Sequence, residues 1–156
     1  MAELVPGIEY AEELEKIRRN YVTATPRQRL SIIRQRLDDH HYGPNRLVTI
    51  VSAVEAFARS LLINHPSKSK AEIKEQYRKF KHSKPEYLVE EFLKLRGQND
   101  PAAFLKEDNW TLFKFAVEYR NMVTHECTYL GLDKFPSLIE GCEEVLEALV
   151  KLNRGN

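Results

Sequence analysis

The chain has 156 residues, of which 42% are hydrophobic, and this predicts one domain whose core needs no disulfide or metal to fold. With 24 Lys and Arg against 23 Asp and Glu, the formal net charge of +1 excludes a binder that depends on a strong field of the whole protein. Only two cysteines are present, no leader pattern opens the chain, and no apolar run approaches the roughly 18 residues of a membrane span, so we expect a cytoplasmic protein with reduced thiols and no contact with a membrane.

The first 44 residues are predicted to form a helical extension packed on the core. Apolar residues at helical spacing indicate one helix over residues 10–21. A second helix begins with Thr25 as its N-cap and Pro26 as its first helical residue. The segment DDHHYGPN, residues 38–45, has the composition of a turn and ends this second helix.

The widest apolar stripe of the chain follows and predicts a long helix over residues 45–64. Its members are Leu47, Ile50, Val51, Val54, Phe57, Ala58, Leu61 and Leu62. Two shorter helices are expected next, the first marked by Ile73, Tyr77 and Phe80. The second begins near Pro85, is marked by Tyr87, Leu88, Phe92 and Leu95, and stops at Gly97.

Two further long helices complete the predicted fold. Asp108 or Asn109 is expected to cap a helix that runs to His125. The last helix covers roughly residues 134–152, and its apolar stripe includes Cys142, which we expect to be a buried and inert thiol. Because no useful stretch alternates with period two, we predict an all-α antiparallel helical bundle, with residues 45–156 as its body.

Charge is distributed unevenly along the chain. Residues 67–86 carry seven Lys or Arg against three Glu, whereas the first 19 residues carry five Glu against three basic groups. Lys74, Arg78 and Lys81 in the basic stretch are therefore candidate contacts for an RNA backbone. The same residues also suit an ordinary solvated helix face, and both interpretations stay open.

One arginine lies where an apolar residue is expected. On a wheel of about 100° per residue that starts at Trp110, Arg120 falls near 280°, in the middle of the apolar sector of its helix. Because desolvating an unpaired guanidinium costs several kcal/mol, an anionic group should face Arg120. Glu55 is the best candidate within the chain, although it could equally pair with Arg59, four residues later on the same helix.

A polar face adjoins Arg120 on the same predicted helix. Its members are Lys114, Glu118, Asn121 and His125. Loosening of the helix near Thr124 would let the imidazole of His125 swing towards Arg120. A fixed cation that binds phosphate, an amide and an imidazole that moves protons are the groups that phosphodiester chemistry needs. A structural arginine beside a surface histidine is the competing interpretation.

The segment FAVEYRNMVTHE, residues 115–126, resembles the signature of the HEPN superfamily (higher eukaryote and prokaryote nucleotide-binding domains). That signature is an arginine, commonly followed by a polar residue, with a histidine after a gap of four to six residues. Arg120, Asn121 and His125 match it with a gap of four. The order of helices, including SAVEAFARSLL over residues 52–62, is also similar to the four-helix core of that superfamily.

The resemblance implies a two-fold homodimer in which the arginine and histidine of both copies meet in a composite cleft. It further implies a metal-independent endoribonuclease, without a cofactor, that leaves 2′,3′-cyclic phosphate and 5′-hydroxyl ends. In that role His125 would transfer protons, Arg120 would stabilise the charge on phosphorus, and Asn121 would position the phosphate or the imidazole. Glu55, Glu118 and Thr124 would support them.

The resemblance also implies a biological setting. Many HEPN proteins are toxins or defence effectors, and a small antitoxin such as a minimal nucleotidyltransferase is an expected partner by this analogy. Two alternatives stay open. The chain is either a HEPN module without catalysis that binds RNA, a nucleotide or a protein, or an unrelated helical adaptor whose motif is a coincidence.

Overall fold

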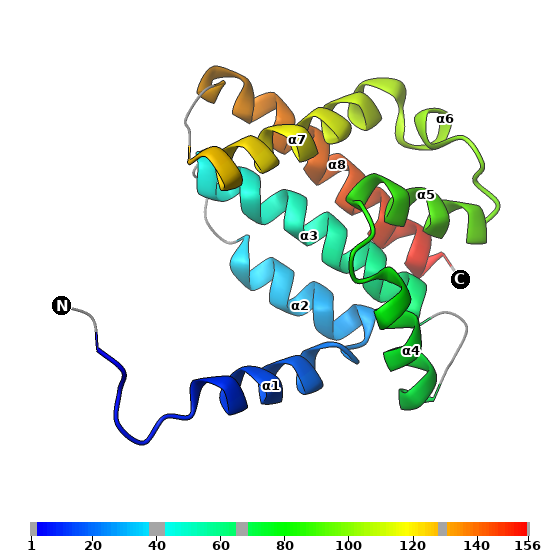
Figure 1. Cartoon of the computed structure of the whole chain (residues 1–156). Helices are drawn as coiled ribbons and strands as arrows, with labels where there is room; N and C mark the ends of the chain where they lie inside the picture. Colours follow the sequence, from blue (N-terminus) through cyan, green and yellow to red (C-terminus); the bar gives the residue numbers. More distant parts are fainter. Residues whose placement is uncertain (1–2, 38–42, 65–68, 128–130, 156) are drawn as a thin grey trace.

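The computed structural model describes residues 3–37, 43–64, 69–127 and 131–155, and over these ranges it contains helices and no strand. The predicted all-α helical bundle is confirmed (Figure 1). The helices are α1 (Tyr10–Tyr21), α2 (Pro26–Arg36), α3 (Pro44–Ile63), α4 (Lys70–Phe80), α5 (Pro85–Leu95), α6 (Pro101–Leu105), α7 (Glu107–Glu126) and α8 (Phe135–Arg154), with a 3₁₀ turn at Leu132–Lys134 before α8. None of the described helices combines the length and apolar character needed to cross a membrane.

Helix α3 is the centre of the bundle, and α5, α7 and α8 pack against it (Figure 1). The eight residues of the stripe predicted for this helix are all buried. Helix α3 is more apolar than the others because it is covered on several sides. Phe57 on α3, Phe113 on α7 and Phe135 at the start of α8 are each at most 1% exposed, so aromatic rings from three helices fill one continuous core.

Helices α7 and α8 approach each other closely at Gly141. A Cβ atom built on Gly141 would lie 2.5 Å from the Cβ of Leu112, which is closer than two carbon atoms can approach. Glycine is therefore required by packing, despite its poor helix propensity. This contact sets the distance between the helix that carries Arg120 and the last helix of the bundle.

The predicted start of α2 is confirmed in detail. The Oγ1 of Thr25 accepts a hydrogen bond from the backbone N–H of Gln28, and the Gln28 side chain accepts one from the backbone N–H of Thr25. Pro26 occupies the first turn, where its missing N–H has no cost. Ser69 and Glu72 form the same reciprocal cap at the start of α4.

The sequence prediction for α5 is wrong in one detail, which is the set of apolar residues that face the core. In α5, Leu88, Val89, Phe92 and Leu93 are buried, whereas Tyr87 and Leu95 are 45% and 51% exposed. The buried arc is centred between Val89 and Phe92, so Leu95 lies just outside one edge of this arc and Tyr87 lies on the opposite side of the helix.

Before α7, the structure contains the short helix α6, which the sequence prediction missed. The carboxylate of Asp100 caps α6 by accepting a hydrogen bond from the backbone N–H of Ala103. Lys106, with a φ of 74°, separates α6 from α7, and α7 begins at Glu107. Asp108 is therefore an exposed residue of the first turn of α7, not its cap. Its charge still suits the positive end of the helix dipole.

Within the predicted N-terminal extension, Ala24 and Ile33 are buried, and Leu30 and Leu37 pack beside Ile33 against α3. Helix α1 instead diverges from the bundle (Figure 1), and all its residues from Tyr10 to Asn20 are exposed. Its apolar stripe is narrow between charged residues, and no element of the described structure covers it. The residues of the predicted turn up to position 42 lie outside the described ranges.

Two of the leucines of α5, Leu93 and Leu95, test the corrected orientation of this helix. Replacing the buried Leu93 by alanine should lower the free energy of unfolding by about 2–5 kcal/mol, because it removes packed methyl groups and leaves a cavity. The matched change Leu95→Ala should alter it by no more than about 0.5 kcal/mol. Urea unfolding followed by circular dichroism measures both, and equal effects would contradict the observed facing of α5.

Candidate functional site

The arginine singled out by its position is partly buried between helices. Arg120 lies in the last two turns of α7, and its side chain is only 17% exposed. Phe113, Ala116 and Val117, which share its helix face, are buried in the core. The helix wheel placed Arg120 in the middle of the apolar sector, and the structure puts its partly buried side chain on that face, where α7 meets α3.

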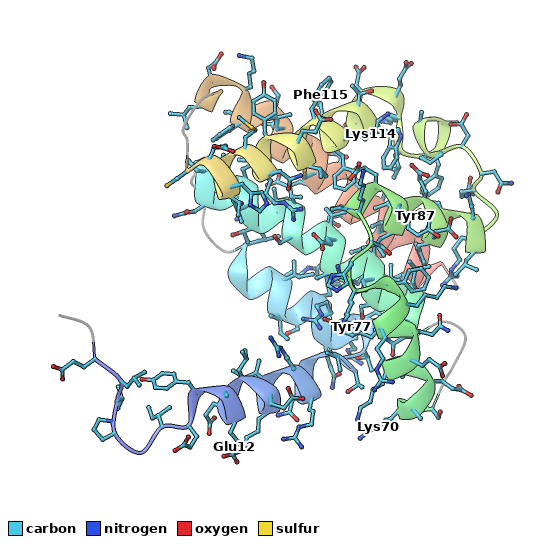
Figure 2. The ribbon with its side chains drawn as sticks, in the orientation of Figure 1. Glu12, Lys70, Tyr77, Tyr87, Lys114 and Phe115 are labelled. Atoms are coloured by element: carbon cyan, nitrogen blue, oxygen red, sulfur yellow. The ribbon has the colours of Figure 1, made fainter. Side chains whose placement is uncertain are left out.

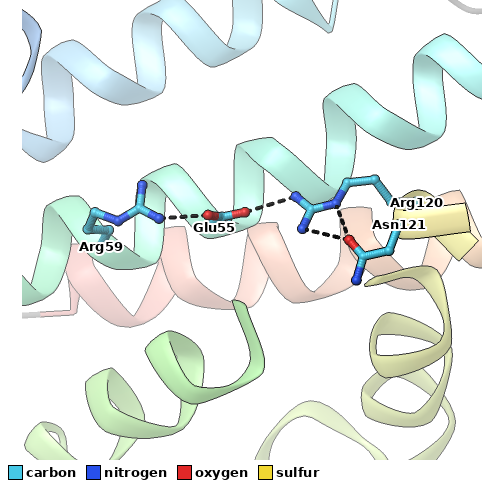
Figure 3. A network of polar contacts seen from close by, with 4 residues as sticks. All are labelled: Glu55, Arg59, Arg120 and Asn121. Carbon is cyan, nitrogen blue, oxygen red and sulfur yellow. Dashed lines mark hydrogen bonds and ion pairs between the residues drawn. The ribbon is translucent and has the colours of Figure 1, made fainter. Parts of the chain in front are cut away.

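Glu55 is the anionic partner of Arg120, as predicted (Figure 3). The Nη1 of Arg120 donates a hydrogen bond of 2.9 Å to the Oε2 of Glu55. The other oxygen, Oε1, accepts a hydrogen bond of 2.6 Å from the Nη2 of Arg59. The two pairings that the sequence left open are thus both present, because each carboxylate oxygen takes one guanidinium.

Two cations share one carboxylate in this cluster. The side chains of Glu55, Arg59 and Arg120 are 22%, 14% and 17% exposed, so water screens them only in part. Because one negative charge faces two positive charges, the cluster keeps a net charge of +1. A guanidinium cannot lose its proton to relieve this excess. An additional anion that reaches the cluster is therefore favoured.

Asn121 holds the solvent side of the Arg120 guanidinium. Its Oδ1 accepts long hydrogen bonds of 3.4 Å from both the Nε and the Nη2 of Arg120 (Figure 3). These bonds are weaker than the bond to Glu55 because of their length. The edge of Arg120 that faces solvent is thus held loosely, and a stronger acceptor such as a phosphate oxygen can replace the amide.

Cys142 of α8 lies beside this cluster and is completely buried. Burial raises the pKa of the Cys142 thiol above its ordinary range, the charge of Glu143 raises it further, and Arg120 opposes both effects. The thiol therefore stays neutral near physiological pH and cannot act as a nucleophile. The prediction of a buried, inert cysteine is confirmed.

The polar face predicted next to Arg120 is also confirmed. Lys114, Glu118, Asn121 and His125 are all exposed, as is Thr124. His125 makes no hydrogen bond or ion pair with another described residue, and α7 continues to Glu126 without loosening at Thr124. On a helix of about 100° per residue, Arg120 and His125 point about 140° apart. One copy of the chain therefore does not bring the two groups together.

Two apolar side chains beside this face were missed by the sequence analysis. Phe115 and Met122 are 51% and 50% exposed, although they lie on the helix that carries Arg120 (Figure 2 labels Phe115). Their spacing of seven residues places them on one side of α7, next to Glu118. That spacing was the signal available in the sequence, because residues seven apart lie on the same side of a helix.

The predicted RNA contacts lie elsewhere in the molecule. Lys74 and Arg78 are exposed on α4, and Lys81 is exposed at its end. Helix α4 packs near the end of α3 that is remote from the last turns of α7 (Figure 1). The structure thus presents the three side chains on one accessible face but does not bring them together with Arg120 and His125.

No side-chain arrangement among the described residues suits a metal ion, since no three His, Cys, Asp or Glu side chains gather there. In comparisons with family models, curated proteins and solved structures, nothing matches this chain. The resemblance of residues 115–126 to the HEPN signature therefore stays a prediction, and the functional argument depends on the residues and their geometry.

Removing the shared carboxylate tests the cluster. Glu55→Gln should lower the free energy of unfolding by about 1–3 kcal/mol, because two partly buried guanidiniums lose their anionic partner. The matched change Glu12→Gln removes an exposed partner of Lys16 and should cost no more than about 0.5 kcal/mol. Chemical denaturation measures both. An equal, small effect would show that Glu55 does not hold Arg120.

Proposed function

We propose that the chain is a metal-independent endoribonuclease of the HEPN type, and that RNA is its substrate. The observation that carries this proposal is the cluster around Arg120. A guanidinium that is only half neutralised by Glu55 lies one turn from an exposed imidazole, His125. A positively charged group that binds phosphate and a group that transfers protons are sufficient for cleavage that uses the 2′-hydroxyl of RNA.

Arg120 is assigned to the phosphate. Glu55 holds one of its terminal nitrogens, which fixes the plane of the guanidinium before substrate arrives. The Nε and Nη2 edge, now on Asn121, can then donate two parallel hydrogen bonds to phosphate oxygens. Charge builds up on these oxygens during attack, so a pre-oriented cation stabilises the transition state more than the bound RNA.

His125 is assigned to proton transfer. The imidazole of His125 removes the proton of the RNA 2′-hydroxyl, whose oxygen attacks the neighbouring phosphorus, and the bond from phosphorus to the 5′-oxygen breaks. The imidazolium formed in this way returns a proton to the leaving oxygen, with a 2′,3′-cyclic phosphate and a 5′-hydroxyl as products. Asn121 lies between the two groups in the sequence and can orient either the phosphate or the imidazole.

In one chain the side chains of Arg120 and His125 point in different directions, and a homodimer would bring the two groups together. Near a two-fold axis each residue faces symmetry-related copies, so the imidazole of one chain can reach the guanidinium of its partner. Phe115 and Met122 supply an exposed apolar surface on α7 next to these groups. Burial of that surface against its own copy would provide the hydrophobic centre of the interface.

A HEPN module without catalysis is the second candidate, and a specific observation favours it. Arg120 already has a good internal partner in Glu55, and His125 faces away from it. A structural ion pair beside a surface histidine would look the same in a single chain. In that case the exposed polar face would bind RNA, a nucleotide or a protein without cutting it.

The setting of this activity is part of the proposal. By its resemblance to HEPN proteins, the chain would act in the cytoplasm as the toxin or effector of a defence module. A small antitoxin, such as a minimal nucleotidyltransferase, would restrain it. The surface that such a partner must cover is the polar face of α7, because access to Arg120 and His125 passes over it.

RNA cleavage in the presence of EDTA distinguishes the two candidates. The purified chain should cut mixed RNA without metal, and both Arg120→Ala and His125→Ala should lower the rate at least about 100-fold, because each removes a main contribution to catalysis. Lys114→Ala, on the same exposed face, is the control and should retain most activity. Gel analysis of end-labelled RNA measures the rates and the ends. Cleavage that persists in His125→Ala would refute the assigned mechanism.

Light scattering tests the dimer separately. The native chain should have the mass of two copies at micromolar concentration, and Met122→Glu should yield monomers because it places a charge in the apolar contact. Leu95→Glu changes an equally exposed residue on α5 and should leave the dimer intact. A native chain that remains monomeric would remove the basis for a composite site.

A further inference from the structure

A pocket of about 240 Å³ lies where the end of α1, the start of α2, α3 and α4 come together. It is separate from the exposed face that carries His125. Its lining includes Arg18 from α1, Arg29 from α2, Arg59 from α3 and Tyr77 from α4 (Figure 2 labels Tyr77). The proposed function uses no part of this pocket except Arg59, which contacts the other side of Glu55.

The charges of the pocket have one sign. Three arginines line it, and no aspartate or glutamate is among its lining residues. Among the described residues, the ion-pair partner of Arg18 is the distant and exposed Glu15, at 3.9 Å. Such a concentration of guanidiniums around a concave surface raises the local potential and attracts anions. A guanidinium can donate two parallel hydrogen bonds to two oxygens of one phosphate. Phosphate is therefore the anion that this lining suits best.

Arg59 is held in place before any ligand arrives. Its Nη2 donates to Glu55, and the side chain is 14% exposed. The ion pair fixes the guanidinium at the wall of the pocket. A cation that is held in place in this way favours binding, because the cost of orienting the side chain is met during folding.

The rest of the lining is apolar. Ile17, Val22 and Ile63 contribute aliphatic surface, and Tyr77 contributes a ring. We propose that this pocket binds a small organic phosphate, whose phosphate contacts the arginines and whose apolar or aromatic part contacts Ile63 and Tyr77. The small volume suits one phosphate ester of the size of a mononucleotide rather than a polymer.

The site also gives α1 a role. Ile17 and Arg18 reach the pocket, while the rest of the helix makes few contacts with the bundle. A ligand held between Arg18 and Arg59 would link α1 to α3 and add contacts that the free chain lacks. Binding should therefore increase the thermal stability of the protein, and the increase should grow with the logarithm of the ligand concentration once this exceeds the dissociation constant.

Isothermal titration calorimetry on the full chain tests this proposal, with AMP and phenyl phosphate as probes and adenosine as the uncharged comparison. At least one of the two phosphate esters should bind saturably at one site per chain, and adenosine should bind at least about ten-fold more weakly than AMP. Arg18→Glu should weaken the binding by roughly ten-fold or more, because it replaces an attractive charge by a repulsive one. Circular dichroism verifies that the variant is folded.

Arg19→Glu is the matched control, because Arg19 is exposed on the same turn of α1 but does not line the pocket. It makes the same change in net charge and should alter the affinity less than about three-fold. Equal losses in the two variants would mean a general field effect and would overturn the proposal. So would the absence of saturable binding of both esters up to millimolar concentration. Binding of single-stranded RNA that depends on Arg18, without binding of either ester, would also overturn it. None of these outcomes depends on whether the chain cuts RNA.

Discussion

The ion pair between Arg120 and Glu55 is the interaction on which the rest of the site depends. A guanidinium at the margin of an apolar helix face must have a partner, and the only way to supply one here is to bring α7 against the middle of α3. The close approach of α8 at Gly141 then holds α7 from the other side. The bundle thus places a permanent positive charge at a helix junction and keeps it near solvent.

Glu55 is the residue that two neighbouring sites have in common. One of its oxygens holds Arg120 towards the exposed face of α7, and the other holds Arg59 towards the pocket beneath α1. Because one carboxylate cannot neutralise two guanidiniums, positive charge is left over on both sides. The same imbalance therefore supports an RNA phosphate at one site and a small phosphate ester at the other. The RNA phosphate and the phosphate ester would bind to different arginines, so they would not compete with each other.

For the proposed nuclease, the geometry of α7 would make assembly of two copies a condition for catalysis. The Arg120 and His125 side chains of one copy point in different directions, and a rigid helix gives no means to turn them towards each other. In the proposed homodimer, a second copy would present its own imidazole from another direction. The exposed Phe115 and Met122 give this face of α7 an apolar character that a solvated helix does not need.

The sequence alone determined the all-α fold, the three long helices, the burial of the α3 stripe and the need of Arg120 for an anionic partner. These features follow from apolar periodicity and from the high cost of an unpaired buried charge, which are both local properties of the sequence. Only the tertiary structure decided which edge of α5 faces α3, that α1 diverges from the bundle, and that arginines from three helices surround one pocket. Residues such as Arg18 and Arg59 are 41 positions apart in the chain, and no spacing rule connects them. Their proximity depends on how complete helices pack, and that is set by the shape of all the contacting faces together.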